Sequence, residues 1–138
     1  MPRILALDYG LKRTGLAWTD PLQIIATGLE TVATEKLGEK LQQLMQLEEI
    51  SELVLGFPTR TDGSDTHATQ AVRNLHEELK KTYPELIIHL WDERFTSRIA
   101  SQTLLDSGAS RKKRRQKGLI DQISATIILQ DFMNSREQ

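Results

Sequence analysis

The sequence predicts an α/β fold, a mixed five-stranded sheet with helices on its faces. Three observations predict it. Short apolar runs bounded by turn residues recur along the chain, which is typical of buried strands. The first three runs are joined by short connections, which favours antiparallel neighbours. The later runs alternate with helical patterns, which favours right-handed crossovers and parallel strands.

The first half of the chain is expected to be rich in strands. Residues 3–8, 14–20 and 23–32 should form an antiparallel meander, with Pro21 marking the second turn. Leucines at helical spacing predict a helix over residues 35–49. Its core-facing side chains would be Leu37, Leu41, Leu44 and Leu47.

The second half is expected to alternate between strands and helices. A strand over 52–56 should end before Pro58, because proline cannot continue a ladder. A helix over 66–81 and a strand over 86–91 follow, then helices over 97–107 and 119–133. The helix over 66–81 should bury Val72, Leu75 and Leu79, and the last helix a stripe of Ile120, Ile123, Ile127 and Ile128.

Length and composition indicate one domain over residues 1–138, with 38% hydrophobic residues to supply its core. The chain has no cysteine, so disulfides and thiolate metal sites are excluded. No apolar run approaches the length of a membrane span, and the first residues lack the layout of a signal peptide. We therefore expect a soluble cytoplasmic protein with no membrane partner.

The charge of the chain is unevenly distributed although its net value is only -1. Residues 94–118 carry eight basic side chains against one acid, a net +7, which leaves -8 on the remainder. Six of the seven residues in RKKRRQK, 111–117, are basic, and the run is either a solvated loop or a clamp for a phosphate backbone. As a clamp it predicts nucleic-acid contacts by Arg111, Lys112, Lys113, Arg114, Arg115 and Lys117, with Arg94 and Arg98 nearer the site. Lys12 and Arg13, next to Gly10, are expected to contact the scissile strand.

Three acids stand at the ends of expected elements. Asp8 ends the first strand, Glu93 follows the fifth, and Asp121 lies in the first turn of the last helix. Phosphodiester hydrolysis can be driven by Mg²⁺ or Mn²⁺ ions held by convergent carboxylates on rigid elements. Each acid also has an ordinary explanation: a turn cap, an ion pair with a nearby arginine, or a favourable place in the helix dipole. The three together favour a shared metal site.

Four blocks carry a resemblance to a known family. They are LALDYGLKRTGLAWTD (5–20), LVLGFPTRTDGSD (53–65), WDERFTS (91–97) and KGLIDQISATIILQDF (117–132). The chain resembles, from end to end, the YqgF family, also called RuvX. The resemblance implies an RNase H-like fold, a relation to Holliday junction resolvases, and nuclease activity in 5′ maturation of pre-16S rRNA.

The resemblance also implies metal-binding roles for Asp8, Glu93 and Asp121. One departure from the related resolvases stands out, since the fourth strand ends in Gly-Phe-Pro with no acid. Glu93 would fill that place, with Asp92 and Asp62 as alternatives. At the position of the resolvases' fourth ligand the chain has Ser124.

Three functions remain open at this point. The first is a metal-dependent nuclease acting on structured RNA, pre-16S rRNA above all, or on branched DNA as a Holliday junction resolvase. The second is an ATP-binding phosphotransferase of the actin and sugar-kinase type, which would need a second related domain. The third is a non-catalytic nucleic-acid-binding module. A monomer or a weak homodimer suits the nuclease.

Overall fold

A computed structural model describes residues 2–57, 67–92 and 117–136. Its strands and helices follow the predicted order. The strands are β1 (Arg3–Tyr9), β2 (Arg13–Thr19), β3 (Ala26–Ala33), β4 (Ile50–Phe57) and β5 (Ile87–Asp92). The helices are the short 3-10 turn η1 (Thr34–Lys36), α1 (Leu37–Leu47), α2 (His67–Thr82) and α5 (Lys117–Arg136). The helix expected over 97–107 and the loop over 59–65 lie outside the described residues.

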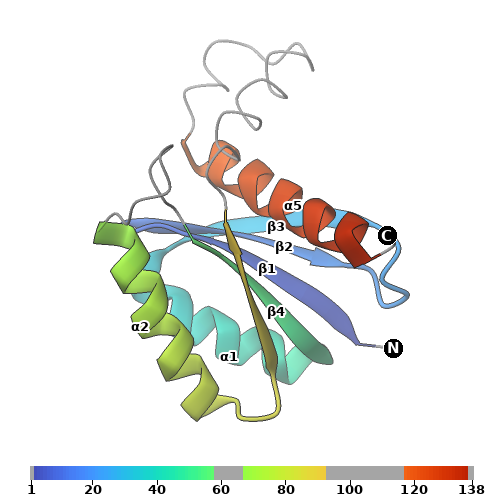
Figure 1. Cartoon of the computed structure of the whole chain (residues 1–138), viewed down its shortest axis with the longest axis horizontal. Helices are drawn as coiled ribbons and strands as arrows, with labels where there is room; N and C mark the ends of the chain where they lie inside the picture. Colours follow the sequence, from blue (N-terminus) through green and yellow to red (C-terminus); the bar gives the residue numbers. More distant parts are fainter. Residues whose placement is uncertain (1, 58–66, 93–116, 137–138) are drawn as a thin grey trace.

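The five strands form one mixed sheet in the order β3-β2-β1-β4-β5. Strands β1, β2 and β3 pair antiparallel, and β1-β4 and β4-β5 pair parallel. The predicted mixed sheet is therefore confirmed. Helix α5 lies on one face of the sheet, and α1 and α2 lie on the other (Figure 1).

Strand alternation divides the core into two layers. Leu5 and Leu7 of β1 pack with leucines of α1 and with Val72 and Leu79 of α2. Ile4 and Ala6 point to the opposite face and pack with α5. The predicted stripe of α1 is confirmed except at Leu47, the last residue of the helix, whose side chain is exposed. In α2, Val72 and Leu79 are buried as predicted, and Leu75 is partly buried against the same core.

The third strand begins at Ala26, three residues later than expected. The Asp20 carboxylate accepts backbone hydrogen bonds from Leu22, Ile24 and Ile25, at 3.1, 2.7 and 2.7 Å. These bonds hold a compact loop, in which Gln23 has a φ of 58°. The hydrogen bonds lower the pKa of Asp20, because the carboxylate is the form that accepts them.

Helix α5 is longer than predicted and is turned differently about its axis. Ile128 is buried as expected, but Ile120, Ile123 and Ile127 are only half-buried. The buried face comprises Ser124, Ala125, Ile128, Leu129, Phe132 and Met133. Apolar residues surround this helix, so periodicity alone could not choose its inward face. Among the described residues, no helix is long and apolar enough to span a membrane.

Candidate active site

Asp8 lies next to the last residue of β1, at the carboxyl end of this central strand. It follows Ile4 and Ala6 at two-residue spacing, and both of those side chains pack against α5. Since side chains alternate along a strand, Asp8 points to the same face. The strand therefore directs this carboxylate toward the helix that carries the second predicted acid.

Gly15 of β2 allows helix α5 to pack closely against strands β1 and β2. It stands opposite Asp8 in the β1-β2 register. A Cβ on Gly15 would lie 2.1 Å from the backbone oxygen of Asp121, so the first turns of α5 rest directly on this glycine. Asp8 and Asp121, from opposite ends of the chain, therefore flank the same residue on the same face of the sheet.

Arg13 reaches Asp121 from the first position of β2. Its Nε donates a hydrogen bond to Asp121 Oδ2 at 2.6 Å, which makes a short, charge-assisted contact. The side chains are 37% and 22% exposed, so the pair is only partly screened by water. A residue expected to contact nucleic acid thus also holds a predicted metal ligand.

The turn before Arg13 is fixed by Thr34, which begins η1. The Thr34 hydroxyl donates to the Gly10 carbonyl at 2.6 Å, and its backbone N–H donates to the Lys12 carbonyl at 3.0 Å. Its hydroxyl oxygen also lies 2.9 Å from that of buried Thr14. Sequence reasoning missed Thr34, because a threonine between a strand and a helix gives no distinctive signal.

Ser124 lies one helical turn beyond Asp121, at the fourth-ligand position named above. Its side chain is fully buried on the sheet-facing side of α5. Its Oγ has no hydrogen-bond partner in the described part of the chain. A buried hydroxyl without a partner is costly, so this one is a polar group available to the site.

The remaining predicted residues are placed only in part. Asp92 ends β5 opposite Phe57, and alternation puts it on the face of Ile88, which packs in the α1–α2 layer. Asp92 therefore does not share a face with Asp8. Glu93, Asp62, Arg94, Arg98 and residues 111–115 lie outside the described residues, as does the side chain of Lys117. Within residues 2–57, 67–92 and 117–136, no three acidic or histidine side chains group into a metal site.

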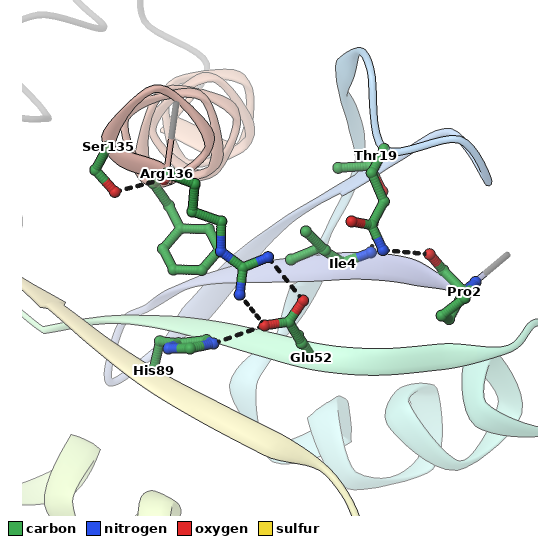
Figure 2. A network of polar contacts seen from close by, with 9 residues as sticks. Pro2, Ile4, Thr19, Glu52, His89, Ser135 and Arg136 are labelled. Atoms are coloured by element: carbon green, nitrogen blue, oxygen red, sulfur yellow. Dashed lines mark hydrogen bonds and ion pairs between the residues drawn. The ribbon is translucent and has the colours of Figure 1, made fainter. Parts of the chain in front are cut away.

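A second polar network fixes the other end of α5 (Figure 2). Arg136 donates from both terminal nitrogens to the Glu52 carboxylate, with Nη1 2.9 Å from Oε2. His89 Nε2 lies 2.9 Å from Glu52 Oε1, and its ring packs on Phe132. Burial alone would raise the pKa of Glu52, but the hydrogen bonds from Arg136 and His89 outweigh it and leave that pKa below its ordinary value. Glu52 was not singled out from the sequence, although an acid within an apolar strand run is a signal for a buried partner.

The fold defines a class of protein. The crystal structure of Fowlpox virus resolvase with substrate Holliday junction DNA is similar to this chain with a TM-score of 0.62. The likeness covers 99% of both chains at 11% sequence identity, so it concerns the fold. The strand order and this likeness identify an RNase H-like fold of the resolvase type.

The family follows from the sequence comparisons. The family model described as "RuvX: Holliday junction resolvase" matches residues 2–135. A protein of Porphyromonas gingivalis described as "Putative pre-16S rRNA nuclease" is 44% identical over 138 residues and covers 100% of both chains. Proteins of the same description from Flavobacterium psychrophilum and Christiangramia forsetii are 43% and 45% identical, each covering at least 96% of both chains. The chain belongs to the RuvX family.

Proposed function

We propose that this chain is a metal-dependent nuclease that hydrolyses phosphodiester bonds during 5′ maturation of pre-16S rRNA. The observation that carries the proposal is that Asp8 and Asp121 both lie next to Gly15, on the same face of the sheet. The family and the description of its relatives support a nuclease that acts on this RNA. Such a substrate agrees with a cytoplasmic location.

The residues beside Gly15 suit Mg²⁺ or Mn²⁺. Both ions prefer oxygen ligands, and two carboxylates from a strand and a helix supply them on rigid elements. The Oγ of Ser124, which has no hydrogen-bond partner among the described residues, is a further oxygen one turn along the same helix. We propose Glu93 as the third acid, so that Asp8, Glu93 and Asp121 hold the metal. When bound, the metal would activate water and stabilise charge on the phosphate.

The protein's own groups would position the nucleic acid. Lys12 is exposed in the turn that follows Asp8, where it can contact a phosphate close to the acids. The basic residues of 94–118 would bind the backbone farther away, through contacts that carry no base information. The substrate would therefore be selected by its shape and by the path of its backbone.

Branched DNA is a second candidate substrate. The family model carries the description of a Holliday junction resolvase, and the fold is shared with a viral resolvase. The same acids and metal would serve that reaction, because both substrates present a phosphodiester. A direct comparison of the two substrates decides between them.

The test compares wild type with Asp8→Asn on a 5′-extended 16S rRNA precursor and on a four-way DNA junction. Each reaction is run with Mn²⁺ and with EDTA. We expect wild type to cleave the precursor with Mn²⁺ only. Asp8→Asn should cleave at least about 100-fold more slowly, because even ligand-orienting partners cost 10- to 100-fold when lost.

Each other outcome has a definite meaning. Equal cleavage by both proteins refutes the site. Cleavage of the junction alone assigns the protein to branched DNA. Binding of either substrate without cleavage, unaffected by Mn²⁺, identifies a non-catalytic nucleic-acid-binding module.

A further inference from the structure

The contact between Arg13 and Asp121 occupies an acid that the proposed function assigns to a metal. We propose that Arg13 competes with the divalent cation for Asp121, holding the carboxylate before the metal binds and releasing it afterwards. This inference rests on the proposed nuclease function. It adds a regulating residue to that site.

The electrostatics give Arg13 this role. Asp8 and Asp121 flank one glycine on one face, and two nearby carboxylates repel each other when no cation lies between them. The guanidinium supplies a positive charge at 2.6 Å from Asp121 Oδ2. Arg13 therefore stabilises the charged form of Asp121 in the protein without metal.

The same contact opposes metal binding. A divalent cation coordinates carboxylate oxygens, at about 2.0–2.1 Å for Mg²⁺. At Asp121 it would bind Oδ1 or Oδ2, and Arg13 already donates to Oδ2. A guanidinium kept at hydrogen-bond distance from that oxygen would lie a few ångströms from the ion and repel it. Binding of the ion and retention of the contact are therefore mutually unfavourable.

The structure allows Arg13 to leave without disturbing its surroundings. Thr34 holds the carbonyls of Gly10 and Lys12, so the turn that precedes Arg13 is fixed. The Arg13 side chain is 37% exposed and can rotate into solvent. Helix α5 stays in place, because its position depends on the backbone contact at Gly15. On the side of Arg13, the exchange requires rotation of one side chain.

A released guanidinium remains useful to the proposed reaction. It would lie beside Lys12 at the edge of the site, where a substrate phosphate would approach. Arginine binds phosphate through two parallel hydrogen bonds. One residue would thus stabilise the acids before the metal binds and the substrate afterwards.

The test measures Mn²⁺ binding to the full chain by titration calorimetry, independently of cleavage. Arg13→Gln should bind Mn²⁺ about 10-fold more tightly than wild type, since a unit charge a few ångströms away in a partly exposed site has at least that effect. Arg13→Lys should lie between the two. The matched control is Lys12→Gln, which removes the same charge from the same turn without breaking the contact to Asp121.

Thermal unfolding provides a second measurement. In EDTA, Arg13→Gln should unfold at a lower temperature than wild type, and saturating Mn²⁺ should reduce or remove that difference. The lower temperature in EDTA should disappear in an Asp121→Asn background, because the partner carboxylate is then absent.

Several results would overturn the proposal. An Mn²⁺ affinity of Arg13→Gln equal to or weaker than that of wild type would show that Arg13 does not compete with the ion for Asp121. The proposed nuclease function would still stand in that case if wild type cleaves its substrate. Equal tightening by Lys12→Gln shows a general charge effect instead of a specific contact. Wild type that binds no Mn²⁺ overturns this inference together with the metal dependence of the proposed function.

Discussion

Replacing Gly15 by alanine tests how the two acids are brought together. The added Cβ would meet Asp121 O at 2.1 Å, Asp121 C at 2.3 Å and Gln122 N at 2.9 Å. All three atoms are helix backbone, so no flexible side chain can move aside. Ordinary contact begins at 3.4 Å, so the first turns of α5 must retreat by roughly 1.3 Å from β2.

The expected cost follows from this displacement. Overpacking a well-packed core costs typically about 1–3 kcal/mol, and contact with rigid backbone puts Gly15→Ala near the upper value. For a chain of this size we expect a melting temperature lower by roughly 10 °C. Since Asp121 is a proposed metal ligand, cleavage of the rRNA precursor should fall by about 100-fold even in the folded protein, because a misplacement of about 1 Å costs that much in the reaction.

Gly38→Ala is the matched control. Gly38 lies within α1, and a Cβ there would meet nothing within 4 Å. Alanine is the better helix former, so this variant should gain up to about 1 kcal/mol and cleave normally. Both proteins are compared by thermal unfolding and by precursor cleavage. A Gly15→Ala protein that melts and cleaves like wild type would show that α5 does not rest on this glycine.

Three further predictions concern other parts of the molecule. Glu52→Gln should lower the free energy of unfolding by about 1–2 kcal/mol at neutral pH. Because folding lowers the pKa of Glu52, the charged carboxylate stabilises the folded protein at pH values above its unfolded pKa. In urea unfolding at several pH values, the difference in free energy of unfolding between wild type and Glu52→Gln should therefore shrink as acid protonates the carboxyl. Thr34→Val should lower the free energy of unfolding by about 1–3 kcal/mol, because it removes the hydrogen bond to Gly10 and leaves the buried Thr14 hydroxyl without that partner. The control is Thr126→Val, which loses only a hydrogen bond within α5 and should cost less in the same denaturation assay. Replacing the basic residues of 111–117 by glutamine should weaken RNA binding and flatten its dependence on salt, and an unchanged slope in a filter-binding titration would show that this run does not contact phosphates.

The sequence was sufficient for the fold. It also singled out Asp8 and Asp121, which the structure places next to the same glycine, while their role as metal ligands stays a prediction. Continuous apolar runs bounded by turn residues, and leucines at helical spacing, report burial directly, so β1, β4, α1 and α2 were predicted almost to their ends. Asp8 and Asp121 were found because each acid interrupts an apolar stretch at the end of an element.

Contacts between single side chains on elements far apart in the chain could not be predicted from the sequence. Arg13 and Asp121 are 108 positions apart, and Glu52 and Arg136 are 84 apart. An ion pair of this kind leaves no periodic pattern, because each charge alone resembles an ordinary surface residue. The predicted inward face of α5 was wrong for a related reason. That face is decided by the residues it packs on, Gly15 and Ala17 of β2 and Ala6 of β1, and periodicity within the helix carries no information about them.

Helix α5 is fixed at two places that make different contributions. Near its start it rests on Gly15 of β2, and near its end it is tied to Glu52 of β4 and packs on His89 of β5. It therefore crosses the sheet over β1, the strand that carries Asp8 (Figure 1). Asp121 and Phe132 are 11 positions apart along the helix, or roughly 16 Å at 1.5 Å per residue. Loss of the Glu52 contact should free the end of the helix while the backbone contact at Gly15 keeps Asp121 beside Asp8. Glu52→Gln should thus lower stability with little change in cleavage by the folded protein, whereas Gly15→Ala should reduce both.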